Sequence, residues 1–65
     1  MKETSKTNRE IFEEKYAHEK LTENPMLCAE AIGYLKALRE YFPSEKKWAD
    51  SYITTLMAVL LFYTL

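Results

Sequence analysis

Glycine and proline are scarce in this sequence, whose 65 residues include one glycine and two prolines. Chains built from β-strands use these residues at frequent turns. Their scarcity leaves little room for strands, repeats or long linkers, and it favours a protein built from helices. A hydrophobic content of 48% and an aromatic content of 14% also exclude a fully disordered chain.

Cysteine and histidine each occur once, as Cys28 and His18. One cysteine cannot form an internal disulfide, and one cysteine with one histidine supplies too few ligands for a structural zinc site. A free thiol fits a reducing compartment, and the polar first ten residues do not resemble a secretory signal, so we expect a cytoplasmic protein. Cys28 falls in an apolar helical stripe with Leu27 and Ala31, which predicts an inert packing role rather than a reactive thiolate.

The sequence also lacks an excess of positive charge, because nine basic and ten acidic residues give a formal net charge of -1. Binding to the phosphates of nucleic acid usually requires a basic surface. The second and third predicted helices could be mistaken for a helix-turn-helix reader of DNA. Beyond Lys47, however, the third helix has no basic or amide side chain to contact phosphates or base edges. A DNA-binding regulator is therefore the least favoured of the alternatives.

Motifs of catalysis are missing as well: there is no glycine-rich phosphate loop and no nucleophile motif. Glu10, Glu14 and His18 recur every four residues, a spacing at which carboxylates and an imidazole could hold a metal or pass a proton. Any charged helix surface produces the same spacing, and no second histidine is present. We therefore expect a surface role for His18, and neither enzymatic activity nor catalytic residues, a bound metal or a cofactor.

Local signals divide the chain into a disordered start, residues 1–6, and a single helical domain, residues 7–65, with helices at about 7–22, 25–42 and 45–63. Thr7 and Glu10 have the spacing of a capping box at the start of the first helix. The apolar residues of this helix are poorly aligned, since Phe12 and Tyr16 share one stripe whereas Leu21 belongs to another. The first helix is expected to dock through Phe12 and Tyr16 and to be the least stable element.

The boundaries of the second helix are clearer. Asn24 is a good helix cap and Pro25 suits a first helical position, so the helix begins there. Pro43 ends it, and Ser44 is expected to cap the third helix. The central Gly33 lies in a row of small residues almost opposite the apolar face. This row either allows another backbone to approach closely or simply faces solvent, and we favour the second interpretation.

The third helix dominates the chain, because from Met57 onward it is apolar nearly all round. Such a segment is expected to be enclosed by protein or lipid. A chain of this length buries a small core, so natural proteins of this size often add oligomerisation. We therefore predict an all-α fold of three helices, in which an antiparallel hairpin of the second and third is completed by homo-oligomerisation into a helical bundle. The residues expected to mediate self-association are Met57, Ala58, Leu61 and Leu65.

A membrane-associated protein with a hydrophobic C-terminal helix is the second interpretation. Residues 51–65 carry no charged side chain, and Lys46 and Lys47 precede them as they would at a membrane boundary. Fifteen residues of helix reach only about 22 Å, however, against a hydrocarbon core of about 30 Å. A short anchor or an interfacial helix is therefore kept as the alternative.

The favoured function is that of a small non-enzymatic regulatory or adaptor protein, acting as a homodimer by binding an unidentified protein. The evidence is the surplus of apolar and aromatic surface together with the missing catalytic motifs. Tyr34 and Tyr41, seven residues apart at the edge of the second helix, are the candidate contacts for that partner, because tyrosine is enriched in interface hot spots.

Overall fold

The computed structural model describes residues 6–64, and these residues form four α-helices and one short 3₁₀ turn. The helices are α1 (Asn8–Lys15), α2 (His18–Glu23), α3 (Pro25–Tyr41) and α4 (Lys46–Thr64), and the 3₁₀ turn η1 spans Pro43–Glu45. The all-α class is thus confirmed for the described part of the chain, which contains no strand. The disorder predicted for residues 1–6 falls, apart from Lys6, outside the described residues.

Two helix starts are built by the side chains that the sequence indicated. The Thr7 hydroxyl accepts a 3.1 Å hydrogen bond from the Glu10 amide, and the Glu10 carboxylate accepts a 2.9 Å hydrogen bond from the Thr7 amide, which completes a capping box. The Asn24 side chain accepts hydrogen bonds from the amides of Met26 and Leu27 at 3.0 and 3.2 Å. Both predicted caps are confirmed.

The single first helix predicted over 7–22 is wrong, because the chain leaves the helical conformation at Tyr16 and Ala17. Leu21 follows Phe12 by nine residues, which places the two side chains about 180° apart on a continuous helix. One straight helix could not turn both toward the core. The break reorients α2, and as a result Phe12, Tyr16 and Leu21 are all buried.

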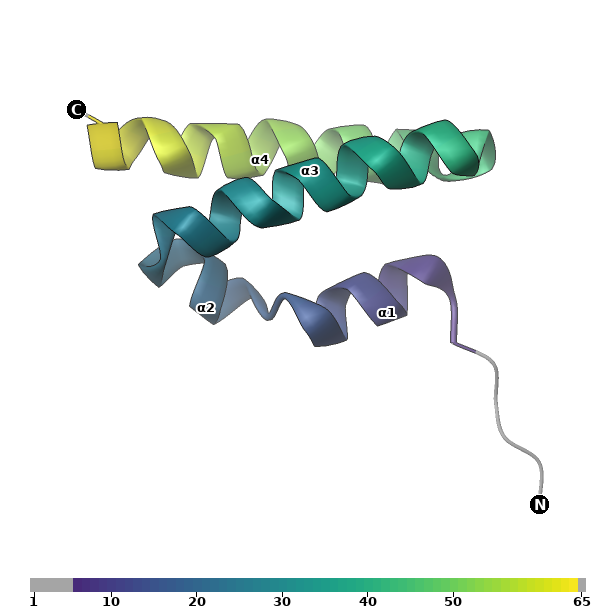
Figure 1. The fold of residues 1–65 in the computed structure, drawn as a ribbon, viewed down its shortest axis with the longest axis horizontal. Coiled ribbons are helices and arrows are strands. Elements are labelled where there is room, and N and C mark those ends of the chain that lie inside the picture. Colours follow the sequence, from purple (N-terminus) through teal and green to yellow (C-terminus); the bar gives the residue numbers. More distant parts are fainter. Residues whose placement is uncertain (1–5, 65) are drawn as a thin grey trace, which may run out of the picture.

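The connection between α3 and α4 also differs from the prediction. Ser44 lies inside the 3₁₀ turn η1 instead of capping the next helix, and α4 begins at Lys46. Pro43 takes the first position of this turn, where a missing amide hydrogen is no disadvantage. The turn is short, and α3 and α4 therefore lie side by side along most of their length (Figure 1).

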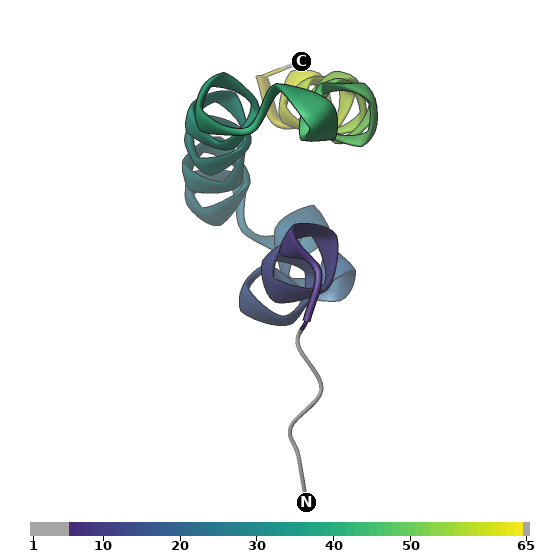
Figure 2. The ribbon, with the colours of Figure 1, turned by 90° about the vertical axis from the view of Figure 1, so that its right-hand side faces the viewer.

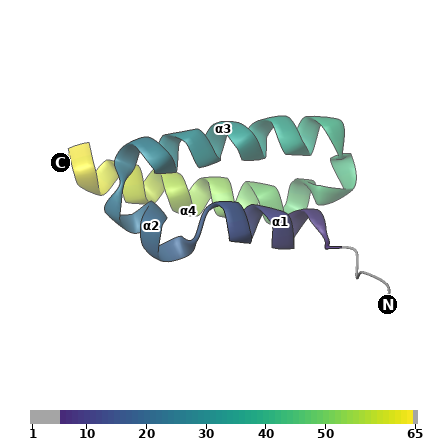
Figure 3. The same cartoon turned by 60° about the horizontal axis from the view of Figure 1, so that its bottom comes forward.

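Seen end-on, α1 and α2 lie against one side of the α3–α4 pair (Figure 2), and α1 runs alongside α4 (Figure 3). The core occupies the space where these layers meet. Its members share burial and an apolar character, and they are Phe12, Tyr16, Leu21, Cys28, Ala31, Ile32, Leu35, Leu38, Ala49, Ile53 and Leu56.

Aromatic rings fill the junction between α1 and the other helices. The Phe12 ring is completely buried, and its centroid lies 5.0 to 6.1 Å from the ring centroids of Tyr16, Tyr34, Trp48 and Tyr52. Tilted and edge-on contacts of this kind add about 0.5 to 1.5 kcal/mol per pair beyond area burial. Docking of α1 through Phe12 and Tyr16 is therefore explained by aromatic packing.

Candidate self-association surface

The two faces of α4 differ in what they contact. Ala49, Ile53 and Leu56 are buried against the core. On the side away from the core, which begins at Met57 and extends through Leu61 to Ala58, the side chains of Met57 and Leu61 are 52% and 61% exposed, and Ala58 is also exposed. Three of the four predicted self-association residues thus form one apolar surface in the described part of the chain. The fourth, Leu65, lies outside the described residues.

Phe62 extends this surface, with 79% of its side chain exposed. The sequence prediction omitted it. Its position four residues after Ala58 would have placed it on the same side of the helix, because residues four apart are neighbours on a helix surface. Met57, Ala58, Leu61 and Phe62 are called the α4 apolar surface below.

The last turns of α4 project beyond the start of α3 (Figures 1 and 3), so few of the described residues can cover them. Tyr63 holds this end in place, because its hydroxyl donates a hydrogen bond to the backbone carbonyl of Thr22 in α2. Leu61 lies about 160° from Tyr63 around the helix. Anchoring Tyr63 against α2 therefore turns Leu61 toward solvent.

The two tyrosines predicted to contact a partner have different surroundings. Tyr34 is half-buried, and its ring centroid lies 5.8 Å from that of Phe12 and 5.7 Å from that of Tyr16. Tyr41 is 80% exposed at the last turn of α3, next to the exposed Phe42. Tyr34 thus takes part in the aromatic junction, whereas Tyr41 is open to solvent. Partner contact by the pair stays a prediction.

Cys28 is completely buried, and its Sγ atom donates a 3.3 Å hydrogen bond to the backbone carbonyl of Leu56 in α4. Burial raises the pKa of the thiol above its ordinary value of 9.0, because a thiolate would lose its hydration. The thiol is therefore kept protonated and out of contact with solvent. These surroundings agree with the packing role predicted for it.

The Glu10, Glu14 and His18 row is not preserved. Glu10 is engaged in the capping box and Glu14 forms a 2.6 Å ion pair with Lys6, while His18 begins α2 beyond the helix break. Over residues 6–64, no group of three or more histidine, cysteine, aspartate and glutamate side chains is arranged to hold a metal ion.

The small-residue row on α3 faces away from the rest of the molecule. A Cβ atom built on Gly33 would meet nothing within 4 Å, and Ala29 and Ala37 on either side are exposed. Within the described residues, therefore, no second backbone lies close to Gly33. The row faces solvent, which was the interpretation favoured from the sequence.

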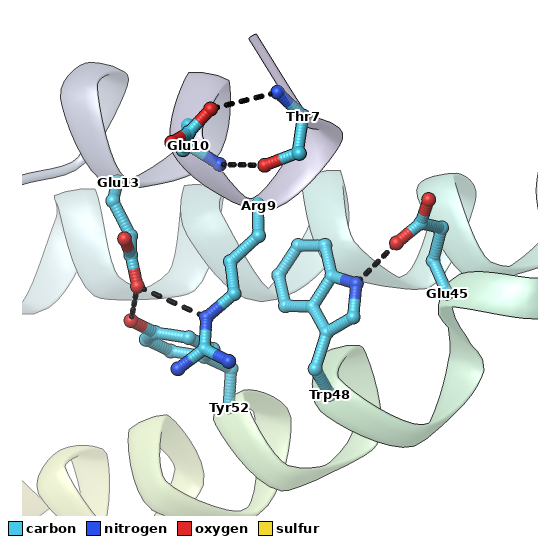
Figure 4. A network of polar contacts seen from close by, with 7 residues as sticks. All are labelled: Thr7, Arg9, Glu10, Glu13, Glu45, Trp48 and Tyr52. Atoms are coloured by element: carbon cyan, nitrogen blue, oxygen red, sulfur yellow. Dashed lines mark hydrogen bonds and ion pairs between the residues drawn. The ribbon is translucent and has the colours of Figure 1, made fainter.

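Polar contacts between residues far apart in the sequence join α1 to α4 (Figure 4) and to η1. The Tyr52 hydroxyl donates a 2.5 Å hydrogen bond to the Glu13 carboxylate, which also accepts a 3.2 Å hydrogen bond from Arg9 Nε. These donors hold the pKa of Glu13 below its ordinary value of 4.5, with Tyr52 the larger cause. Glu45 accepts hydrogen bonds from the Trp48 indole and from the Asn8 amide, the latter at 3.1 Å.

A second polar contact joins α3 to α4. Arg39 forms an ion pair with Asp50, and Lys46 approaches the same carboxylate at 2.8 Å. Hydrogen bonds from Lys46 and then Arg39 hold the pKa of Asp50 below its ordinary value of 3.8. The pairs Arg9–Glu13 and Lys46–Asp50 follow from the i,i+4 spacing of a helix, and the first of them was expected from the sequence. The contacts between helices could not be found in this way, since Glu13 and Tyr52 are 39 residues apart and Arg39 and Asp50 are 11 apart.

No protein-family model, curated protein or solved structure matches this chain. Across the described residues, no helix has both the length and the apolar character needed to cross a bilayer. Of the large apolar side chains exposed in the described residues, Met57, Leu61, Phe62 and Tyr63 all come from the last two turns of α4.

Proposed function

We propose that this protein is a small non-enzymatic regulatory or adaptor protein that acts by binding other proteins, and that it works as a homodimer formed through the α4 apolar surface. In this proposal α3 and α4 are an antiparallel hairpin that a second copy completes into a helical bundle. One observation carries the proposal: Met57, Leu61 and Phe62 expose large apolar side chains side by side on a helix whose other face is already buried.

Burial on a partner would stabilise the assembly. Fully burying one such side chain contributes about 1.5 to 3 kcal/mol, and these side chains are between half and four-fifths exposed. A two-fold axis places each residue against the same surface of the other copy, so every contact is made twice. The polar residues Ser51 and Thr54, earlier on the same face, mark where the interface would end.

The test compares two variants by size-exclusion chromatography with light scattering in detergent-free buffer. Leu61→Glu puts a charge into the proposed interface, and it should convert a dimer into a monomer that keeps its helical circular dichroism. Thr54→Glu puts the same side chain on the same face two turns earlier, and it should leave the dimer intact. A Leu61→Glu variant that retains both the parent's mass and its helicity would contradict the proposed interface.

A second candidate uses the same surface against lipid, because exposed methionine, leucine and phenylalanine side chains at one end of a helix also suit the boundary of a bilayer. Here α4 would lie at the membrane surface. The intact chain should then sediment with phosphatidylcholine vesicles, and a chain ending at Thr54 should not. A sharp dimer that ignores the vesicles would exclude this candidate.

A further inference from the structure

A hollow of about 690 Å³ lies between α4 and the α1–α2 segment, and none of the four residues of the α4 apolar surface lines it. Small-molecule sites in proteins typically measure about 300 to 1,000 Å³. The wall formed by α4 consists of two rows of side chains, each spaced four residues apart. The opposite wall is formed by one residue of α1 and one of α2.

The first row on α4 is apolar and consists of Trp48, Tyr52 and Leu56. The Trp48 and Tyr52 rings meet edge-on, with centroids 5.9 Å apart and planes at 87°. Both rings are fixed: the Trp48 indole donates to Glu45 and the Tyr52 hydroxyl donates to Glu13. The row is therefore a preformed apolar platform, which reduces the entropy lost when a ligand binds.

The second row is polar and consists of Lys47, Ser51 and Thr55. Lys47 is exposed and forms no ion pair with any carboxylate of residues 6–64. The Thr55 hydroxyl donates a 3.1 Å hydrogen bond to the Ser51 carbonyl, which leaves the lone pairs of its oxygen to accept. Eight residues of helix separate Lys47 from Thr55, a distance of about 12 Å.

Arg9 and His18 complete the hollow from the other side. The Arg9 guanidinium lies 5.7 Å from the centroid of the Tyr52 ring, and only its Nε is used by Glu13. Figure 4 shows its two terminal nitrogens without a contact to the residues drawn. Among the described residues no aspartate or glutamate lines the hollow, but two carboxylates contact its lining: Glu13 accepts from Arg9 and Tyr52, and Glu45 accepts from the Trp48 indole.

We propose that this hollow binds a small organic acid: a carboxylate carried on an aromatic or alkyl body. Lys47 and the terminal nitrogens of Arg9 attract the carboxylate, and guanidinium groups pair with carboxylates through parallel hydrogen bonds. The apolar body lies on the rings of Trp48 and Tyr52, which are partly exposed, whereas Leu56 itself is buried. The two rows run side by side along α4, and a ligand with one charged and one apolar part fits both at once.

Trp48 is the only tryptophan of the chain, so its fluorescence reports directly on the hollow. The probe is 4-phenylbutyrate, and its neutral analogue 4-phenylbutyramide is the control ligand. The acid should change the Trp48 emission saturably and bind about fivefold or more tightly than the amide, the factor expected for one charge pair at about 4 Å in water. Equal affinities, or no saturable response to the acid, would overturn the proposal.

Two matched variants test whether Lys47 supplies the positive charge that attracts the carboxylate. Lys47→Gln should weaken binding of 4-phenylbutyrate about fivefold and leave binding of the amide unchanged. Lys36→Gln removes an exposed lysine from α3, outside the hollow, and should change neither. Unaltered affinity for the acid in Lys47→Gln, with native circular dichroism, would refute the assignment. Leu61→Glu should bind the acid normally, because the hollow contains no residue of the proposed dimer interface.

Discussion

The Tyr52 hydroxyl on α4 donates a 2.5 Å hydrogen bond to the Glu13 carboxylate on α1, across 39 residues of sequence. The Tyr52 ring also lies edge-on to the ring of Phe12, with centroids 5.0 Å apart. One side chain thus supplies both an apolar and a polar contact to α1. A substitution that removes the hydrogen bond and keeps the ring contact therefore shows how much the hydrogen bond contributes to holding α1.

Tyr52→Phe removes the hydrogen bond and keeps the ring. We expect the free energy of unfolding in urea to fall by about 0.5 to 1 kcal/mol, because Glu13 can turn to water. Hydrogen exchange of the α1 amides should increase more than that of α3. The control is Tyr41→Phe, since the Tyr41 hydroxyl makes no hydrogen bond within residues 6–64. Equal stability of both variants would show that the bond does not hold α1.

Ala17→Ser tests the break between α1 and α2. Ala17 occupies the cap position of α2 with extended backbone angles and supplies no side-chain cap. A serine hydroxyl there should accept a hydrogen bond from a free amide of α2 and raise the free energy of unfolding by about 1 kcal/mol. In a continuous helix the same change would lower it by about 0.5 kcal/mol. A urea melt that shows a loss would contradict the break.

Gly33→Ala should stabilise the protein by about 1 kcal/mol, because Gly33 is a mid-helix residue and nothing lies within 4 Å of an added Cβ. Ala37→Gly, at an exposed position one turn later, should cost a similar amount. Thermal melts of both variants give the comparison. A destabilised Gly33→Ala, or one whose mass in solution falls below the parent's, would instead show that another backbone packs on this row.

Cys28 should react with a thiol reagent at least about a hundredfold more slowly in the folded protein than in 6 M guanidinium, because labelling requires unfolding of a domain with about 3 to 5 kcal/mol of stability. The raised pKa of the buried thiol slows the reaction further. A second thiol introduced by Ala29→Cys, on the exposed face of α3, should react rapidly and serves as the control. Fast modification of Cys28 in the native protein would argue against its packing role.

Acid should destabilise the protein through Glu13 and Asp50. Their folded pKa values lie below the ordinary 4.5 and 3.8, so the unfolded chain takes up protons first as the pH falls. The stability they contribute is present above these ordinary values and is lost as the pH falls through the lowered ones. Glu13→Gln with Asp50→Asn should flatten the acid side of a plot of unfolding free energy against pH.

The control for the acid effect is Glu23→Gln, which removes an exposed carboxylate that has no ion-pair partner among residues 6–64. This variant should follow the parent's profile between pH 3 and 7. An unaltered acid limb in the double variant would show that other carboxylates cause the loss of stability.

Local chemistry determined much of the fold. Thr7 with Glu10, and Asn24 with Pro25, start their helices wherever the chain packs, because their hydrogen bonds span only two or three residues. The apolar stripe of α3 and the buried face of α4 also follow from the helical period. The exposed positions of Met57, Ala58 and Leu61, outside that face, agree with the same helical period.

Tertiary packing decided the remainder. Phe12 and Leu21 lie on opposite sides of one helix, and only the presence of a shared core explains why the chain breaks between them to bury both. The hydrogen bond from Tyr52 to Glu13, and the hollow beside it, depend on where α1 lies against α4. Helical periodicity carries no information about such contacts, because it describes the neighbours of a residue within one helix and not those that folding brings from another.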